Sequence, residues 1–320
     1  MKENSQPNVN PFPYTDSNKR YHTYDYYLRH RYGGKCVKIP LDGGFTCPNI
    51  DGRCGVGGCI YCSARGSGDF TFSALPLSEQ YEKQRAVMGK KWETARCIPY
   101  LQAHTNTYAP LARLKEIYEE ILTFPDVVAF HIATRADCLP DEVIDYLHDL
   151  SMRCDITLEI GLQSVFDQTA AFINRGHTYA DFLHAYEKIR ERAPGVRISV
   201  HLINGLPNED RDMMMESAET VGALMPDEIK FHLLHVMKNT GMAKLYESGE
   251  YTPLSLPEYA DILVSQIERL SKEIVIGRVT GDAPRDLLLA PLYSLKKFVV
   301  MNEIDKLFVQ RDTMQGKHRK

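Results

Sequence analysis

The sequence of 320 residues contains no apolar run near the roughly 18 to 20 residues that a membrane-spanning helix needs. Its first twenty residues, MKENSQPNVNPFPYTDSNKR, are polar and lack the apolar centre of a secretory signal. We therefore expect a cytoplasmic protein without a membrane partner. Basic residues are not in excess either, because 38 Lys and Arg stand against 42 Asp and Glu, a net charge of -4. This balance argues against a wholly basic nucleic-acid coat, leaves room for a local basic patch, and gives no reason to expect DNA as a partner.

Cysteine is too sparse for a disulfide scaffold, with eight residues in the chain. In a reducing compartment such cysteines are metal ligands or buried thiols. Internal repeats are also missing. Hydrophobic residues make up 43% of the chain and charged residues 25%, which excludes wholesale disorder, collagen and coiled coil. The length suits about two domains or one large α/β barrel with extensions.

Short β-branched or apolar runs alternate with segments of helical spacing along most of the chain. The runs predict strands at 36–41, 96–102, 127–132, 155–160, 197–203 and 228–233, and the spacing predicts helices at 78–91, 112–123, 141–151, 179–192 and 210–224. Alternation of this kind indicates right-handed βαβ units and a parallel sheet. Polar residues and glycine follow nearly every strand, which favours a partial barrel with its site at the strand carboxyl ends over a doubly wound sheet.

We expect three parts in the chain. Residues 1–35 form an arm that is first polar and then basic and aromatic. Residues 36–250 form the α/β core, a partial (β/α)6 barrel of parallel strands. Residues 251–320 form a carboxyl-terminal α/β extension, in which a helix at 257–272, a strand at 273–278 and a final apolar helix close the barrel.

Four cysteines, Cys47, Cys54, Cys59 and Cys62, fall within sixteen residues, in CPNIDGRCGVGGCIYC. The glycines between them let the backbone wrap closely around an inorganic group. A zinc site would use all four thiolates, although structural zinc usually shows two close cysteine pairs and only one is present. A plant-type ferredoxin cluster would use Cys54, Cys59 and Cys62 with a distant fourth ligand. A 4Fe-4S cluster on Cys47, Cys59 and Cys62 would leave one iron open, with Tyr61 beside whatever that iron binds.

The run GFTCPNIDGRCGVGGCIYC at 44–62 resembles the radical S-adenosylmethionine (SAM) proteins of the YhcC and YtqA family, relatives of the catalytic subunit of Elongator. The resemblance covers about residues 18 to 295. It continues through YLQAHTNTYAP, IATRADCLPDEV, LEIGLQS, NRGHT, HLINGLPNED, IKFHLLHVMKNT and GDAPRDLLLAP. Eight motifs in order are far more specific than one cysteine triplet.

The resemblance implies a partial barrel of six parallel strands, which agrees with the strands predicted above. It implies Cys47, Cys59 and Cys62 as ligands of a 4Fe-4S cluster, with SAM bound to the fourth iron through its amino and carboxylate groups. One electron would then cleave SAM to methionine and a 5'-deoxyadenosyl radical that abstracts hydrogen from substrate. A reducing donor such as flavodoxin or ferredoxin is expected. Cys54 departs from the family pattern and is left out of the ligand set.

Four more residues are candidates for contact with SAM. Relatives place polar contacts at the end of the fourth strand, where Glu159 and Gln163 lie; the alternative is that Glu159 pairs with an arginine such as Arg135 and braces the barrel. Thr105 and Asn106, after the second strand, could bind the amino group of SAM, with capping of the following helix as the alternative.

Histidine and arginine offer weaker signals. His232 and His235 alternate with leucines, and at least one of them is expected to face the cavity. His201 is more simply explained as a satisfied histidine of the barrel. Arg175 could bind a carboxylate or phosphate, and a surface salt bridge is an equal alternative.

The segment 19–38 is basic and aromatic, with only Asp25 as a counter-charge. Basic side chains neutralise phosphates and aromatic rings stack on unpaired bases, as recognition of single-stranded RNA requires. The candidate RNA contacts are Lys19, Arg20, Arg29, Arg31 and Lys35. The alternative is an arm packed across the bottom of the barrel.

The resemblance to the catalytic subunit of Elongator implies a radical SAM enzyme that modifies the carbon-5 side chain of a tRNA wobble uridine. About 70 residues follow the sixth strand and its loop, and they contain no acetyl-coenzyme A loop. We therefore expect remodelling of an existing substituent, such as a carboxymethylaminomethyl group, in place of acetyl transfer. Two alternatives remain: a radical SAM enzyme for a small metabolite or porphyrin-like substrate, and a non-catalytic zinc-stabilised RNA-binding protein.

Overall fold

A computed structural model describes residues 10–66, 68–93 and 95–319, so the first nine residues of the expected arm lie outside it. Its main sheet has seven strands in the order β1-β2-β3-β4-β5-β6-β8, and every neighbouring pair is parallel. These strands are β1 (Cys36–Leu41), β2 (Arg96–Leu101), β3 (Ala129–Thr134), β4 (Asp155–Gln163), β5 (Arg197–Asn204), β6 (Glu228–Leu233) and β8 (Val275–Arg278). An antiparallel pair, β7 (Val236–Met237) and β9 (Leu288–Ala290), stands apart from this sheet.

Helices precede, connect and follow the strands. They are α1 (Tyr24–Tyr32), α2 (Leu77–Gly89), α3 (Leu111–Leu122), α4 (Asp141–Ser151), α5 (Asp167–Phe172), α6 (Tyr179–Arg192), α7 (Arg211–Ala223), α8 (Gly241–Glu247), α9 (Leu256–Ile267) and α10 (Lys297–Gln310). Short 3-10 turns lie at Gly68–Phe70, Ala136–Cys138 and Leu292–Leu295. Within the described residues, none of the helices has both the length and the apolar character needed to span a bilayer.

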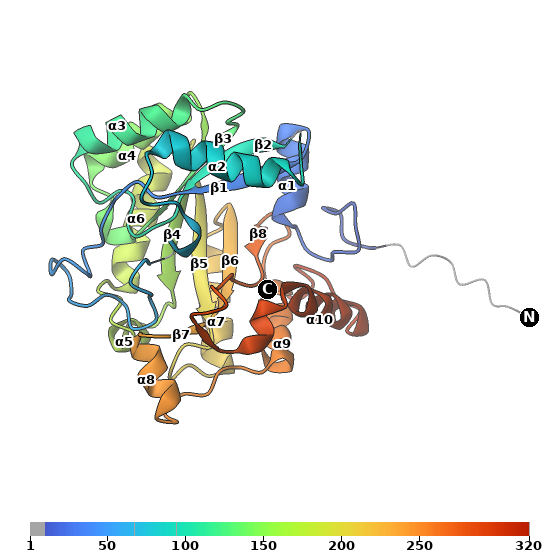
Figure 1. Ribbon diagram of the computed structural model, residues 1–320. Helices are drawn as coiled ribbons and strands as arrows, with labels where there is room; N and C mark the ends of the chain where they lie inside the picture. The colour runs from blue at the N-terminus through green and yellow to red at the C-terminus, as the bar shows by residue number, and fades with distance from the viewer. Residues whose placement is uncertain (1–9, 67, 94, 320) are drawn as a thin grey trace, which may run out of the picture.

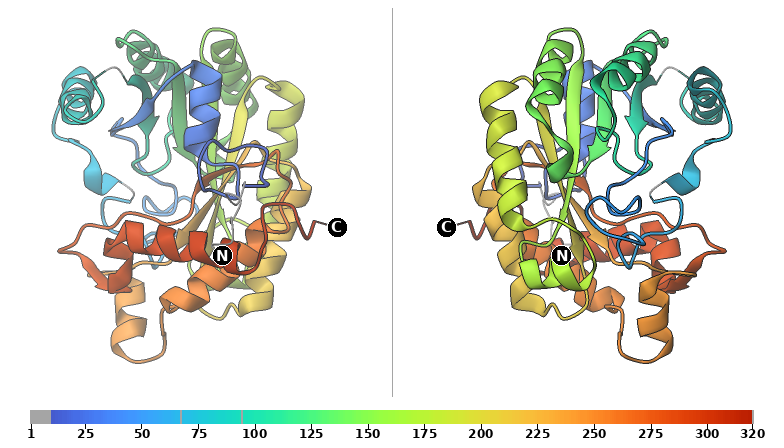
Figure 2. Two further views of the ribbon diagram at one scale, coloured as in Figure 1. Left: turned by 90° about the vertical axis from the view of Figure 1, so that its right-hand side faces the viewer. Right: turned by 90° about the vertical axis from the view of Figure 1, so that its left-hand side faces the viewer.

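The strands lie side by side in the order of the chain, which makes the sheet an open barrel. A doubly wound sheet would reverse that order at a switch point. Helices α2, α3, α4 and α6 lie outside the curved sheet, and α9 and α10 cover its other end (Figures 1 and 2). The predicted partial α/β barrel is confirmed.

Local sequence explains the elements that form the barrel. In β4, seven consecutive residues are buried, as expected for a strand covered on both faces. In α4, apolar residues at helical spacing, Val143, Ile144, Leu147 and Leu150, face the sheet and are buried. These side chains belong to one hydrophobic core that runs under most of the strands.

Three details differ from the sequence prediction. The strand predicted at 273–278 pairs in parallel with β6, so the sheet has seven strands and not six. Strand β3 begins two residues later than predicted, because Asp126 takes a left-handed φ of 61° and Val127 only bridges Cys97. Helices α1, α5 and α8 and the pair β7 and β9 were not predicted, since they are short or lack a clear apolar period.

Helix α1 docks the amino-terminal arm on the barrel. Thr23 caps it by accepting a hydrogen bond from the Tyr26 amide. The hydroxyl of Tyr24 reaches His131 inside the barrel, at 3.0 Å from Nε2. Thr23 itself forms a parallel bridge with Ile276 of β8. The arm therefore packs against both edges of the sheet and against its interior.

Candidate functional site

The cysteine loop follows β1 at the carboxyl end of the barrel and is tied to distant parts of the chain. The Ile60 amide donates to the carbonyl of Ile173 at 3.0 Å, and the Ile60 carbonyl accepts from the Met242 amide at 2.9 Å. The side chain of Asn174 donates to the carbonyl of Gly58 at 2.7 Å. Backbone from the β4–α6 region and from α8 thus fixes the place of Cys59 and Cys62.

A buried asparagine organises the inside of this loop. Asn49 is fully buried, and its Nδ2 donates to the carbonyl of Asn174 and approaches the Cys59 sulfur at 3.6 Å. A Cβ on Gly55 would lie 2.0 Å from Oδ1 of Asn49, so only glycine fits there. The Oδ1 atom is buried without a hydrogen-bond partner. A buried oxygen without a partner indicates that the loop is arranged to hold a bound group in addition to its own side chains.

The thiols of Cys59 and Cys62 interact directly. A hydrogen bond from Cys62 is the main cause that lowers the pKa of Cys59 to about 5, and the same bond raises the pKa of Cys62. The guanidinium of Arg175 acts to lower both pKa values, and Cys47 lies near enough to raise that of Cys62. The thiolate form of Cys59 is therefore favoured even without a metal. The guanidinium of Arg175 lies where it can balance negative charge.

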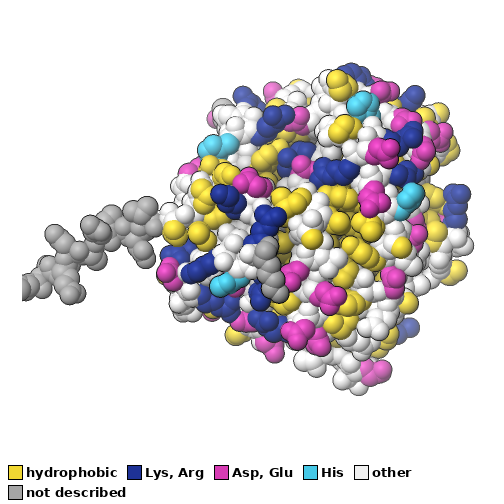
Figure 3. Space-filling model, turned by 180° about the vertical axis from the view of Figure 1, so that it is seen from behind, with side chains coloured by type: hydrophobic (Ala, Val, Ile, Leu, Met, Phe, Trp, Pro, Cys, Tyr) yellow, Lys and Arg dark blue, Asp and Glu magenta, His cyan; other side chains and the backbone are white. Residues whose placement is uncertain are grey.

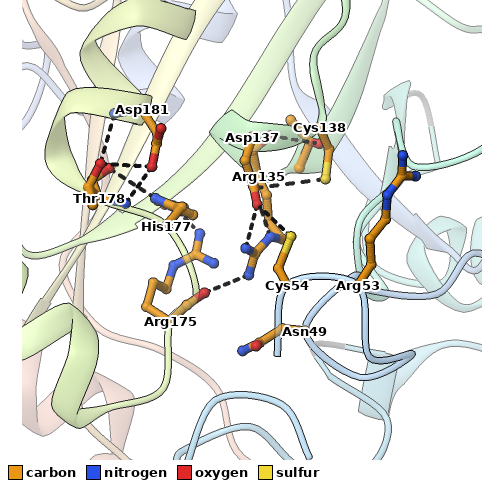
Figure 4. Close-up of polar contacts among 12 residues, drawn as sticks. Asn49, Arg53, Cys54, Arg135, Asp137, Cys138, Arg175, His177, Thr178 and Asp181 are labelled. Carbon is orange, nitrogen blue, oxygen red and sulfur yellow. Dashed lines mark hydrogen bonds and ion pairs between the residues drawn. The ribbon is translucent and has the colours of Figure 1, made fainter. Parts of the chain in front are cut away.

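Two buried arginines, Arg135 and Arg175, both act to lower the pKa of Cys59, and Figure 4 shows them with Asp137 and Cys54. Arg135 donates to the Arg175 carbonyl at 2.7 Å and makes a bidentate ion pair with Asp137. Arg175 donates to the carbonyl of Gly161, and its Nε is buried without a partner. Arg135 and Arg175 therefore bring two guanidinium groups to the cysteine loop, and Asp137 pairs with Arg135.

Cys54 faces a different space. Its sulfur lies 3.6 Å from Oδ2 of Asp137, and burial together with that carboxylate raises its pKa. It lines a cavity of about 830 Å³ beside the cysteine loop, together with Arg53, Tyr108 and Asp137. The described residues that line this cavity do not include Cys47, Cys59 or Cys62. The geometry thus separates Cys54 from the other three.

The residues around the loop fit an iron-sulfur cluster. Three cysteines supply soft ligands, the thiolate form of Cys59 is favoured, and Arg175 and Arg135 would offset the negative charge of thiolates and sulfide. No three His, Cys, Asp or Glu side chains of the described chain meet closely enough for a single metal ion.

Comparison with known proteins decides the family. Residues 50–221 match the family model described as the radical SAM superfamily, and residues 226–309 match that of a radical SAM C-terminal domain. The chain is 45% identical to the protein YtqA of Bacillus subtilis over 309 residues, which is 96% of this chain and 95% of YtqA. The chain belongs to the radical SAM superfamily.

Further relatives agree with this assignment. The protein YhcC of Escherichia coli is 33% identical over 90% of this chain and 92% of its own length. A tRNA uridine(34) acetyltransferase of Methanocaldococcus jannaschii is 26% identical over 51% of this chain and 30% of that protein. The solved structure of the archaeal Methanocaldococcus infernus Elp3 superposes with a TM-score of 0.64 at 15% identity, over 88% of this chain and 64% of that one, which shows a shared fold.

Radical SAM proteins bind a 4Fe-4S cluster and SAM, and this radical SAM chain is an enzyme. The resemblance found from the motifs is confirmed, as are the two cofactors. The comparisons do not test which residues hold them, so the cysteine ligands and the SAM contacts remain predictions. The structure shows what each of these residues does in the protein.

Thr105 and Asn106 do not cap the helix that follows them. Pro110 precedes α3, and no side chain caps that helix. Asn106 is fully buried, and its Nδ2 donates to the carbonyls of Leu101 and Ala133, which joins the ends of β2 and β3. Its Oδ1 has no partner, and Thr105 is buried beside it. The capping alternative is wrong, and contact with SAM remains a prediction.

Glu159 lies at the centre of a buried group of charges that we call the interior cluster. Its members are Lys38, His131, Glu159, His201 and Lys230. Oε1 of Glu159 accepts from Lys38 at 2.5 Å and from His131 at 2.6 Å, and Oε2 accepts from His201 at 3.1 Å and from Lys230. Burial alone would raise the pKa of Glu159, but Lys230 and Lys38 hold it well below its ordinary value. Glu159 therefore braces the barrel, but it pairs with two lysines and not with Arg135. Contact of Glu159 with SAM remains a prediction.

Gln163 ends β4 in an unusual backbone conformation. Its φ is 72°, and the pairing with β5 shifts register between Gly161 and Gln163. A Cβ on Gly161 would lie 2.9 Å from Nε2 of Gln163, so the glycine makes room for that amide. Oε1 is buried without a partner. Because strained backbone concentrates at functional sites, this geometry supports Gln163 as a ligand contact.

The candidate RNA contacts of the arm all have acidic partners. The pairs are Lys19 with Asp305, Arg20 with Asp312, Arg29 with Asp16 and Asp25, Arg31 with Asp155, and Lys35 with Asp25. The side chain of Arg20 is only 7% exposed, so Arg20 as a surface RNA contact is wrong and the packed-arm alternative applies to it. The other four are partly exposed, and RNA contact there remains a prediction.

Sequence reasoning missed several residues that shape the site. Asn49 and Asn174 clamp the cysteine loop across more than one hundred residues of chain. The ion pair of Arg135 with Asp137 was also not foreseen. The position of Asn49 and Asn174 in the sequence could have indicated their role. Both lie next to or inside motifs with glycines of positive φ, where close backbone approach is typical.

Proposed function

We propose that this radical SAM enzyme modifies the side chain at carbon 5 of a tRNA wobble uridine. The observation that carries the proposal is the match of half the chain to tRNA uridine(34) acetyltransferases and to Elongator complex protein 3 of mouse, at 26% and 28% identity. These matches cover 30% of the relatives' own length. The shared segment therefore supports a common substrate class, and not the whole activity of those proteins.

We propose Cys47, Cys59 and Cys62 as the residues that would hold the 4Fe-4S cluster. When bound, the cluster supplies the electron that cleaves SAM to a hydrogen-abstracting radical. Arg175 and Arg135 would balance the charge of the thiolates, and burial of Cys59 limits the access of water. Tyr61, Thr105 and Asn106 lie in loops that follow β1 and β2, Glu159 and Gln163 lie in β4, and these five residues would contact SAM.

The reaction that fits best is remodelling of an existing substituent, such as a carboxymethylaminomethyl group. Removal of a hydrogen atom from the carbon next to an amine would weaken the neighbouring bonds of such a side chain. An electron donor of the flavodoxin or ferredoxin class, a cytoplasmic location and the division into residues 1–35, 36–250 and 251–320 are parts of the same proposal.

Nucleoside analysis of tRNA tests the proposal. Total tRNA from cells with and without the protein is digested, and the nucleosides are quantified by mass spectrometry. Loss of the protein should raise one carbon-5-substituted wobble uridine and lower its product. A catalytically inactive Cys59→Ala copy should fail to restore the product. An unchanged wobble nucleoside would rule out this tRNA substrate and favour a small metabolite.

A further inference from the structure

A second group of unpartnered polar atoms lies across the barrel from the cysteine loop. His232 stands at the carboxyl end of β6, His235 follows β6, and Thr280 and Gly281 follow β8. Among the described residues, Nε2 of both histidines and Oγ1 of Thr280 are buried without a hydrogen-bond partner. A buried Nε2 without a partner is tolerated best without its proton, so both rings are expected to carry the proton on Nδ1 and to offer it as a donor.

Both imidazoles turn a second nitrogen toward Gly281. A Cβ on Gly281 would lie 3.1 Å from Cε1 and 3.6 Å from Nδ1 of His235, and 3.8 Å from Nδ1 of His232. Neither Nδ1 atom is sealed from solvent, and neither makes a hydrogen bond within the described part of the chain. Gly281 therefore packs closely against His235, and the two accessible ring nitrogens converge on the space beside it.

The surroundings favour neutral rings. Burial is the main cause that lowers the pKa of His235 to about 4 and that of His232 well below its ordinary value. A neutral ring with its proton on Nδ1 donates toward Gly281 and keeps a bare Nε2 inside the protein. Nearby, Asp282 is balanced by Lys297 at 2.8 Å and by Arg278 at 3.6 Å, two cations against one carboxylate.

We propose that His232 and His235 bind a carboxylate of the substrate in the space above Gly281. Two converging N–H donors match the two oxygens of a carboxylate, and the guanidinium of Arg278, which lies near both histidines, favours an anion. The site lies at the carboxyl ends of β6 and β8, where a barrel of this kind binds its ligands. The inference rests on the proposed function, and it assigns the residues that distinguish a carboxylate-bearing wobble side chain from one without it.

Binding of two RNAs to the anaerobically reconstituted enzyme tests this assignment. The probes are anticodon stem-loops that differ only at the wobble uridine, which carries carboxymethylaminomethyl in one and aminomethyl in the other. The unaltered enzyme should bind the first RNA roughly 10-fold or more tightly than the second, as expected for hydrogen bonds to a charged group. His232→Phe and His235→Phe should each bind the two RNAs with equal affinity.

Three further variants separate the role of these side chains from general damage. Gly281→Ala keeps both imidazoles but fills the space, and it should also abolish the preference. His235→Gln retains a donor and should retain part of the preference. His148→Phe, at a histidine of α4 that also has an unpartnered nitrogen, should bind like the unaltered enzyme.

The outcomes distinguish the two proposals. If the unaltered enzyme binds both RNAs equally well, or if Gly281→Ala keeps the preference, the carboxylate site is wrong while tRNA remains the substrate. If the unaltered enzyme binds neither RNA, the proposed tRNA function fails, and the carboxylate site fails with it.

Discussion

Single residues inside the barrel carry unusual charge states. His131 and His201 both bond Glu159, yet burial lowers the pKa of His131 to about 3 and that of His201 to about 4. Lys230 and Lys38 already neutralise Glu159, so protons on the histidines would add uncompensated positive charge. The interior cluster is therefore built with neutral imidazoles that donate to the carboxylate.

These pKa shifts predict a loss of stability in mild acid. As the pH falls below about 6.5, the unfolded chain binds protons that the folded His201 does not bind until about pH 4, so folding becomes less favourable. His201→Gln keeps a donor to Glu159 and removes this titration. Between pH 7 and pH 5 the variant should lose about 2 kcal/mol less of its unfolding free energy than the unaltered protein. Urea unfolding at both pH values measures the difference.

His184→Gln, at an exposed histidine of α6, controls for the replacement of a histidine by glutamine elsewhere in the protein. Equal losses in the unaltered protein and in His201→Gln would show that His201 is not held neutral.

The candidate site could be predicted from sequence only in part at the scale of residues. The cysteine spacing and the motifs point to Cys47, Cys59 and Cys62 because their chemistry is local. Asn49 and Arg175 escaped full assignment because their roles depend on contacts with residues far away in the chain. Arg20 was misassigned because its partner, Asp312, lies at the other end of the sequence.

At the scale of elements, the strands of the barrel were the most predictable features. Each is a short apolar run bounded by proline, glycine or polar residues, and burial on both faces reinforces that pattern. Helix α1 was missed because YDYYLRHRY alternates aromatic and charged residues, and only Leu28 is buried. Its stability comes from docking against the barrel and not from an apolar face.

The docking of α1 predicts a specific cost for Tyr24→Phe. This change removes only the hydroxyl that bonds His131 and leaves a buried ring nitrogen unpaired. The unfolding free energy should fall by about 1–3 kcal/mol. Tyr26→Phe, on the same helix, removes a hydroxyl for which no hydrogen bond is seen among the described residues and should change stability little. Chemical unfolding measures the stability of both variants. If Tyr24→Phe is as stable as Tyr26→Phe, docking of the helix through Tyr24 is contradicted.

At the scale of the whole molecule, the two ends of the described chain meet. Nε2 of Gln315 donates to the carbonyls of Ser271 at 2.6 Å and Ile274 at 2.8 Å, and its Oε1 accepts from the His22 amide at 2.8 Å. On the face shown in Figure 3, Asp and Glu lie among the Lys and Arg side chains. The positive charge of residues 19–38 is thus offset by carboxylates of the folded chain, in line with the net charge of -4.

Gln315→Ala tests whether this junction stabilises the molecule. Three buried backbone groups would lose their partner at once, so the unfolding free energy should fall by at least about 2 kcal/mol. Gln310→Ala, at the exposed end of α10, is the matched control and should have little effect. A thermal midpoint for Gln315→Ala equal to that of the control would show that the junction is dispensable.

The most direct test of the account is the iron content of four cysteine variants after anaerobic reconstitution, measured together with 5'-deoxyadenosine formed from SAM. Cys47→Ala, Cys59→Ala and Cys62→Ala should each lose the cluster and the cleavage of SAM. Cys54→Ala should keep both, because Cys54 faces the cavity beside Asp137. Full iron content and SAM cleavage in any of the first three variants would contradict the three-cysteine site.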